Sequence, residues 1–453
     1  MTDAVAAVDA AVIADPQPAL APAGLGYRRY ALGLLLVVYI LNFLDRQVIN
    51  ILVEPIRHDL HLADWQLGLM TGSVFAVFYT FLAIPIARGA ERFSRPWILA
   101  GSMALWSGFT ALCGITRTFP QLLLARLGVG FGEAGCTPSA HSMIADDTPQ
   151  KDRSFALGFY AMGTPLGTLL GLAMGGVVAD AWGWRAAFFV AGAPGIIVAL
   201  IAALTLKEPR KRLAARNAET KAASAGFGET TRYLAAKPTF WLFSFAAAVF
   251  AFVGYGDNAF ISSFFLRNHA SEIAHLAAGF GLQSRGFTGI AIGLIGGLTG
   301  AVGSLLGGGV TDRAGAKNPK AFATLPAVIG LIWAPLFAIA ILAPTAVTSL
   351  GLFIVPSVMA TFWYGPIYGT VQSVAPPHMR STAAALLLFI INIIGLGLGP
   401  LAFGAFSDFL AGPLGLGSAA SIKWTLVASA AASLPAIALL LLARRTIERD
   451  LVS

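Results

Sequence analysis

The stretch GGVTDRAGAK, residues 308–317, repeats a pattern that the chain already carries as ARGAERFSRP at residues 87–96. Each stretch follows an apolar segment of about 20 residues, which is the length a helix needs to cross a bilayer. Sliding one half of the chain by 221 residues superposes Glu91 on Asp312. The same short basic turn at matching places in both halves predicts two structural repeats that face each other, the arrangement that alternating access requires.

The composition sets the class of protein. The 453 residues are 57% hydrophobic and 11% charged, whereas soluble domains have about 25% charged residues. Apolar runs recur along the whole length, so we predict an all-α polytopic membrane protein with 12 transmembrane helices in two six-helix pseudo-symmetric repeats. The predicted spans are about 30–53, 65–87, 97–116, 120–144, 154–180, 185–206, 239–266, 286–310, 321–342, 349–374, 381–410 and 421–443.

The net charge of +8 comes from lysines and arginines that cluster in alternate loops. This pattern indicates topology control by positive charge rather than binding to nucleic acid, and it places both termini and the long middle loop in the cytoplasm. The predicted organisation is therefore a disordered tail over 1–27, a six-helix bundle over 28–206, a cytoplasmic linker over 207–238, a second bundle over 239–443 and a tail over 444–453.

Other chemistries find no support in the sequence. Both cysteines, Cys113 and Cys136, lie in apolar segments, and no metal-ligand spacing or ATP-binding loop occurs, so we expect no metal and no cofactor. A membrane enzyme would need clustered nucleophilic or metal-binding residues, and the sequence shows no such cluster, so we do not expect this protein to be an enzyme. A channel is disfavoured by the repeat and by helices interrupted with glycine and proline.

The segment ILNFLDRQVIN, residues 40–50, places Asp45 beside Arg46 in a stretch apolar enough to lie in lipid. Charges inside a membrane are costly and usually mark a pathway for ions or substrate. At 1.5 Å per residue, Asp45 lies about 22 Å along the first helix, far from its start.

The fourth predicted span reads RLGVGFGEAG, residues 126–135. Arg126 and Glu133 are seven residues apart, so they share one face of a helix. Asp45 falls between them in height, and four ionisable groups therefore gather in one zone of the first bundle. We interpret them as a site, with Asp45 and Glu133 taking up protons; a self-neutralised cluster that only fixes helix packing is the alternative.

The second half carries aromatic and amide residues in place of charges. Such residues suit the apolar part of an amphipathic ligand, although tryptophan and tyrosine also serve as packing and interface anchors. The predicted substrate-binding residues are Arg46, Arg126, Tyr255, Asp257, Asn258, Trp363, Tyr364 and Asn392.

The duplicated turn predicts a cytoplasmic gate, formed by Glu91 and Arg92 in the first half and by Asp312 and Arg313 in the second. An acid at a helix end can pair with a base or a helix N-terminus of the other half while that face is shut. The pattern G-x-x-x-D-R-x-G-x-K at 308–317 resembles the cytoplasmic signature of the major facilitator superfamily. The first copy departs from it, because Glu91 replaces aspartate and two glycines are lost.

The resemblance extends to one branch of that superfamily. NFLDR, then DWQLGLMTGSVFAVFYTFLAIPIARGAERFSRP, then RLGVGFGEAG and PSAHSMIADDTPQKDRS are similar to the spinster branch, best over residues 35–175. The resemblance implies export of sphingosine-phosphate-like or lysophospholipid-like molecules, coupled to protons, with Asp45, Arg46, Arg126 and Glu133 as site residues.

We therefore expect a secondary transporter that works by rocker-switch alternating access on an amphipathic anionic molecule. Its partners are the lipid bilayer, protons and the substrate, and we expect it to act as a monomer. In a bacterium it would lie in the inner membrane. A proton-coupled transporter of small organic anions is the alternative, since it needs the same arginines but no apolar wall.

Overall fold

The computed structural model of the chain describes residues 24–149, 152–208 and 227–451, and no strand occurs among them. The greater part of the predicted first tail (1–23), the centre of the predicted linker (209–226) and the last two residues lie outside these described residues.

The first bundle contains the helices that precede the predicted linker. They are α1 (Leu25–Leu60), α2 (Asp64–Gly68), the π-helical η1 (Leu69–Ser73), α3 (Val74–Arg92), α4 (Arg95–Cys113), α5 (Phe119–Glu133), α6 (Cys136–Asp147), α7 (Arg153–Ala161) and α8 (Gly163–Thr205).

The second bundle follows the linker. Its helices are α10 (Phe227–Ala235), α11 (Pro238–Asn268), α12 (Ala270–Gly279), α13 (Ser284–Gly315), α14 (Ala321–Leu342), α15 (Ala346–Met359), α16 (Tyr364–Val374), η3 (Pro377–Met379), α17 (Arg380–Ile390), the π-helical η4 (Ile391–Leu398), α18 (Gly399–Ala411), α19 (Gly417–Ala432), α20 (Leu434–Ala443) and α21 (Ile447–Asp450).

Ten stretches of the described chain are long and apolar enough to cross a membrane. One of them, Phe155–Thr205, contains two predicted spans, because Gly183 at φ 84° reverses the direction of α8. Glycine adopts this φ without strain. The fourth predicted span is divided between α5 and α6, each shorter than a crossing helix, with helical backbone angles at Ala134 and Gly135 between them. Counted in this way, the ten stretches and the α5–α6 segment correspond to the twelve predicted spans.

Glycines let the helices of the first bundle approach closely. A methyl group at Gly167 would lie 2.5 Å from the carbonyl oxygen of Ile40, and one at Gly171 would lie 2.7 Å from that of Leu44. These distances are far below van der Waals contact, so the first segment of α8 packs directly on the backbone of α1 through its glycine face. This contact fixes the depth of the charged residues on α1.

Two segments predicted as linker and tail are ordered helices. Leu234 of α10 and Ile447 of α21 are fully buried in the core of the second bundle. The backbone N–H of Thr239 donates a hydrogen bond of 3.0 Å to the carboxylate of Asp450. These ends of the predicted linker and tail contain enough apolar side chains to pack against the second bundle, which charge counting did not detect.

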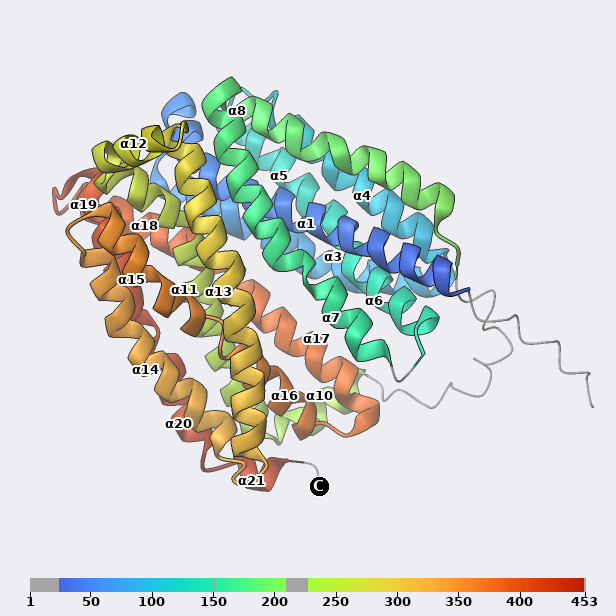
Figure 1. Cartoon of the computed structure of the whole chain (residues 1–453). Coiled ribbons are helices and arrows are strands. Elements are labelled where there is room, and N and C mark those ends of the chain that lie inside the picture. The colour runs from blue at the N-terminus through green and yellow to red at the C-terminus, as the bar shows by residue number, and fades with distance from the viewer. Residues whose placement is uncertain (1–23, 150–151, 209–226, 452–453) are drawn as a thin grey trace, which may run out of the picture.

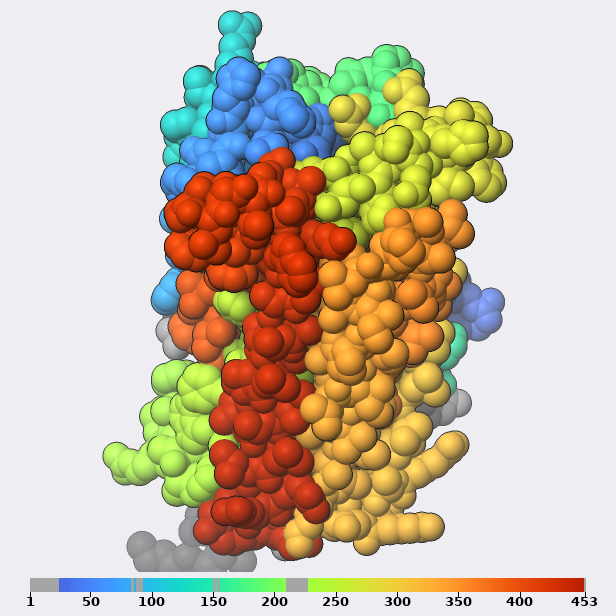
Figure 2. All heavy atoms as spheres, turned by 90° about the vertical axis from the view of Figure 1, so that its left-hand side faces the viewer, coloured from blue at the N-terminus to red at the C-terminus, as the bar shows by residue number. Residues whose placement is uncertain are grey.

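The two bundles meet at one end and diverge at the other. Figure 1 shows the meeting point at the upper left, near α12, α18 and the hairpin of α8, with α7 and α17 on the diverging side. We call the first end the closed face, formed around Glu54, Asp64, Arg267 and Asp408. The opposite end, where α1 begins and α21 lies, is the terminal face. In Figure 2, the blue residues of the first bundle lie directly above the red-orange end of α18 at the closed face.

Candidate functional site

The charged residues predicted on α1 and α5 lie together inside the first bundle. Arg46 Nη2 is 2.6 Å from Glu133 Oε2, and Glu133 is fully buried. The guanidinium of Arg46 also contacts three rings, with its Cζ 5.2 Å from the centroid of Phe43, 4.6 Å from Phe75 and 5.1 Å from Tyr79. This aromatic cage and the ion pair hold the cation in an otherwise apolar wall.

Asp45 and Arg126 lie deeper than Arg46. Their exposed fractions are 1% and 0%. The hydroxyl of Thr110 donates a weak hydrogen bond of 3.4 Å to Asp45 Oδ2, while all three guanidinium nitrogens of Arg126 lack a hydrogen-bond partner among the described residues. The ring of Phe75 contacts both guanidinium groups, since the Cζ of Arg126 is 5.7 Å from its centroid. Arg126 is thus an underpaired buried cation beside the Arg46–Glu133 pair.

A cavity of about 1140 Å³ lies between the two bundles. Arg46 lines this cavity, whereas Asp45, Arg126 and Glu133 do not in this conformation. The lining includes Phe227 at the start of α10, so the cavity extends toward the terminal face. A ligand in it would meet Arg46 first, and would meet the other three charges only after side chains rearrange.

All six predicted residues of the second bundle line this cavity. Asp257 Oδ1 accepts a hydrogen bond of 2.9 Å from the hydroxyl of Ser429. The amide of Asn258 donates a hydrogen bond of 3.2 Å to Gln47 Oε1 of the first bundle. The lining residues predicted from the sequence are Tyr255, Asp257, Asn258, Trp363, Tyr364 and Asn392.

Stacked aromatic rings form much of the second-bundle wall. The ring centroids of Trp363 and Tyr364 are 4.1 Å apart, and those of Tyr364 and Tyr368 are 6.1 Å apart. Trp333 and Phe337 of α14, which the sequence analysis did not select, stack at 4.9 Å and also line the cavity. Their spacing of four residues puts both rings on one helix face, a signal that could have identified them.

The predicted gate residues of the second bundle are not engaged at the terminal face. Asp312 and Arg313, near the end of α13, are exposed, and no ion pair joins either to another described residue. The side chains of Glu91 and Arg92 lie outside the part of the chain that the structure describes. Nearby, the side chain of Arg95 is 1% exposed and pairs with Asp146 of the first bundle at 2.7 Å and with Glu208, just after α8, at 2.6 Å.

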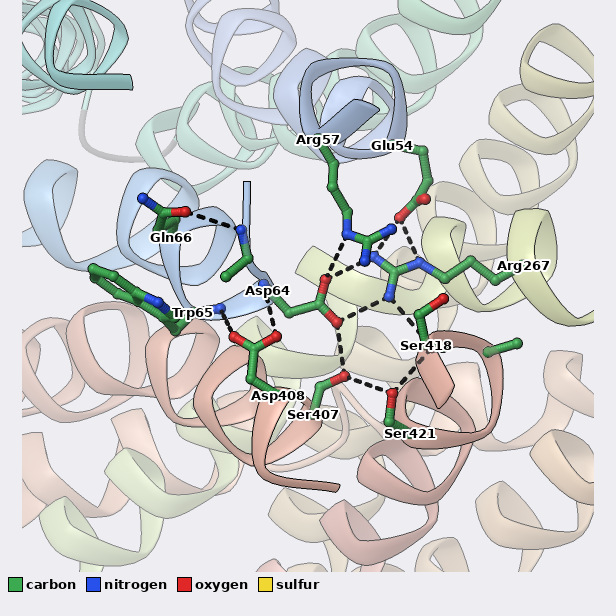
Figure 3. Close-up of polar contacts among 12 residues, drawn as sticks. Glu54, Arg57, Asp64, Trp65, Gln66, Arg267, Ser407, Asp408, Ser418 and Ser421 are labelled. Carbon is green, nitrogen blue, oxygen red and sulfur yellow. Dashed lines mark hydrogen bonds and ion pairs between the residues drawn. The ribbon is translucent and has the colours of Figure 1, made fainter. Parts of the chain in front are cut away.

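The closed face carries a polar network that sequence reasoning missed. Arg267 of α11 pairs with Glu54 of α1 at 2.7 Å and with Asp64 of α2 at 2.8 Å (Figure 3). Asp408 of α18 accepts hydrogen bonds from the backbone N–H groups of Asp64 at 3.0 Å and Trp65 at 2.7 Å. These contacts join the two bundles, because Arg267 and Asp408 belong to the second bundle and their partners to the first.

A second connection reinforces the closed face. Asp180 of α8 pairs with Arg285 at 3.1 Å and accepts a hydrogen bond of 2.7 Å from the backbone N–H of Gly286, at the start of α13. A methyl group at Gly289 would lie 2.1 Å from the carbonyl oxygen of Leu172, so the backbones of α13 and α8 touch there. The closed face is therefore sealed by both ion pairs and close helix packing.

Comparisons with known proteins agree with this fold. Residues 35–400 match the Major Facilitator Superfamily. A solved bacterial homolog of the human lysosomal transporter spinster, in an inward-facing and occupied conformation, is 32% identical, with a TM-score of 0.83 over 95% of this chain and 99% of that one. An MFS-type efflux pump of Mycolicibacterium smegmatis is 30% identical over 85% of this chain and 86% of its own length. Protein spinster homolog 1 of Homo sapiens is 28% identical over 85% and 75%.

Two six-helix bundles around a central cavity, together with this match, define the class: the chain belongs to the Major Facilitator Superfamily and is a multi-pass membrane transporter. Within that superfamily it is a member of the spinster branch, as the sequence motifs predicted.

Proposed function

We propose that this transporter moves an amphipathic, anionic, lipid-like molecule by proton-coupled alternating access. The observation that carries the proposal is the cavity of about 1140 Å³, in which one caged guanidinium, Arg46, faces a long aromatic and apolar wall. Pockets for drug-sized ligands measure about 300–1,000 Å³. A larger cavity with charge on one side and rings on the other suits a single-chain lipid with a phosphate or carboxylate head.

The alternating-access part rests on the asymmetry between the two faces. The ion pairs that join the bundles lie at the closed face, while the cavity extends toward the terminal face. With the termini in the cytoplasm, as the distribution of bases indicates, this state is inward-facing. The similar bacterial spinster homolog was solved in an inward-facing conformation, which supports the same orientation here.

The proton-coupling part rests on the Arg46–Glu133 pair. An anionic headgroup and Glu133 would compete for one guanidinium, because a carboxylate that neutralises Arg46 at 2.6 Å occupies the donors that the headgroup needs. Protonation of Glu133 removes this competitor and frees Arg46. Asp45, held beside Arg126 in the same cluster, would take up the second protonation role, and Arg126 would stabilise the anionic substrate once it enters.

The second candidate is a proton-coupled carrier of small organic anions, which Arg46 alone could bind. The stack of Trp363, Tyr364 and Tyr368 favours the lipid-like substrate, because a small hydrated anion gains nothing from an apolar wall of this extent. The cavity forms within one chain, which is consistent with a working monomer, in the inner membrane if the host is bacterial.

A thermal-shift screen with purified protein tests the substrate class. The ligands are lysophosphatidate, a sphingoid phosphate, the neutral monoacylglycerol of the same chain length, and small organic anions. We expect stabilisation by the two anionic lipids, weaker stabilisation by the neutral lipid, and loss of this difference in Arg46→Ala. Stabilisation by small anions alone would support the second candidate and contradict the lipid assignment.

A further inference from the structure

Asp257 is a buried carboxylate in the wall of the cavity, and no described residue forms an ion pair with it. It is 8% exposed, and its only hydrogen bond among the described residues is the one that Oδ1 accepts from Ser429. Oδ2 has no hydrogen-bond partner among the described residues, yet it is not fully enclosed by protein atoms. Because the residue lines the cavity, this oxygen faces the cavity space. A buried carboxylate is stable when it is paired with a cation or hydrogen-bonded on both oxygens.

The charge of the cavity lining makes this carboxylate stand out. Among the described residues, the lysine, arginine, histidine and acidic residues of the lining are Arg46, His141 and Asp257. Arg46 is already neutralised by Glu133 at 2.6 Å. The second-bundle wall therefore presents one uncompensated acid to whatever enters the cavity.

Asp257 and Arg46 line the same cavity from different bundles, Arg46 on α1 and Asp257 on α11. The hydrogen bond of 3.2 Å between Gln47 and Asn258 joins the residues that directly follow Arg46 and Asp257. The helices that carry the two charges are thus in direct contact one residue further on, and both charges line one cavity.

We propose that Asp257 binds a positively charged amine of the substrate, so that the transported molecule is zwitterionic, with its anionic group at Arg46 and its ammonium group at Asp257. This inference rests on the proposed function and adds a specificity-determining residue to it. Ser429 would hold the carboxylate in position through Oδ1 and leave Oδ2 for the ammonium group.

The test compares lipids that differ only in the amine. Lysophosphatidylethanolamine carries a free ammonium group, N-acetyl-lysophosphatidylethanolamine of the same chain length lacks the charge, and lysophosphatidate lacks the whole group. Affinities are measured by quenching of intrinsic tryptophan fluorescence, since Trp333 and Trp363 line the cavity. A charge-assisted hydrogen bond contributes enough for the wild type to bind the free amine about tenfold more tightly than the acetylated lipid.

In Asp257→Asn we expect this ratio to fall to about one, with the affinity for N-acetyl-lysophosphatidylethanolamine unchanged. Ser357→Ala is the matched control, because its hydroxyl also lies in the cavity lining but donates to the carbonyl of Phe353 on its own helix, so the preference should persist. If Asp257→Asn does not yield monodisperse protein, Asp257→Ser serves the same purpose.

Two results would overturn the proposal. A wild type that binds the free and acetylated amines equally would mean that Asp257 carries its own proton or stays empty. A preference that survives in Asp257→Asn would place the amine elsewhere. Either result leaves the lipid-carrier function standing, whereas a wild type that binds none of the three lipids overturns that function together with this inference.

Discussion

The network at the closed face predicts a strong shift of conformation when Arg267 is replaced by methionine. Arg267 is 6% exposed on its side chain and pairs with Glu54 and Asp64, whose side chains are 8% and 2% exposed. Removing one partner of a buried ion pair costs about 3–5 kcal/mol, because an uncompensated charge remains. Arg57 stays 3.3 Å from Asp64 and compensates in part, so the lower value of about 3 kcal/mol applies.

Since 1.4 kcal/mol is a factor of ten, the variant should disfavour the state with the closed face shut by roughly 100-fold. Spin labels at Ile115→Cys and Leu414→Cys report the distance between the bundles at this face, because both side chains are exposed. The native Cys113 and Cys136 are replaced by alanine in this background. We expect the short distance of the parent to give way to a longer one as the main population.

The matched control is Arg185→Met. Arg185 pairs with Asp59 at 2.8 Å, but the two side chains are 38% and 43% exposed and belong to the same bundle. Such a pair contributes about 0–1 kcal/mol and does not join the moving parts. An unchanged distance distribution in Arg267→Met, or an equal shift in Arg185→Met, would refute the assignment of a lock at the closed face.

Three further predictions concern the charged cluster and the terminal face. Glu133→Gln should leave binding of anionic lipid intact but independent of pH, and should abolish uptake driven by a pH gradient. Asp45→Asn should also abolish this gradient-driven uptake. Uptake at the wild-type level in both variants would disprove the coupling assignment. Arg46→Ala should lower the affinity for anionic lipids about tenfold or more with little effect on neutral ones, and so should Arg126→Ala if the substrate reaches the deeper cation. Arg46→Lys should restore only part of the affinity, because lysine cannot pair bidentately. Equal losses for charged and neutral lipids would indicate a structural role. Asp312→Asn should shift the equilibrium of the terminal face a few-fold toward opening, since an exposed contact contributes up to about 1 kcal/mol. The measurement is the spin-label distance between the α3–α4 and α13–α14 turns. An unchanged distance would show that this motif only sets topology.

The fold was predictable because it depends on local signals. Runs of apolar residues and alternate basic loops indicate the spans without any knowledge of tertiary contacts. The depth of Asp45 and Arg46 followed from helix rise alone, and the structure brings Arg46 and Glu133 into direct contact. A charge in an apolar helix is conspicuous because few other residues share its polarity.

The closed-face network was not predictable in the same way. The 221-residue shift that superposes Glu91 on Asp312 also superposes Arg46 on Arg267. Yet Arg46 lies 14 residues before the end of α1 and Arg267 one residue before the end of α11. Depth depends on where each helix ends, which apolar runs define only loosely. The acidic partners of Arg267 lie more than 200 residues away in the chain, so only tertiary structure brings them together.

The position of Arg126 exposes a second limit. Its helix and depth were predicted, but its separation from the cavity depends on how α5 packs and on the ring of Phe75, which contacts it. Helix periodicity gives the face on which a residue lies, whereas it does not specify which side chain of a neighbouring helix covers that face.

The most direct test of the central claim is the flux of lysophosphatidylethanolamine or lysophosphatidate into proteoliposomes as a function of an imposed pH gradient. We expect saturable transport that reverses direction when the gradient is reversed, that is abolished in Arg46→Ala, and that does not respond to the gradient in Glu133→Gln. Transport of the lipid that ignores the gradient in the wild type, or that continues unchanged in Arg46→Ala, would contradict proton-coupled carriage through this cavity.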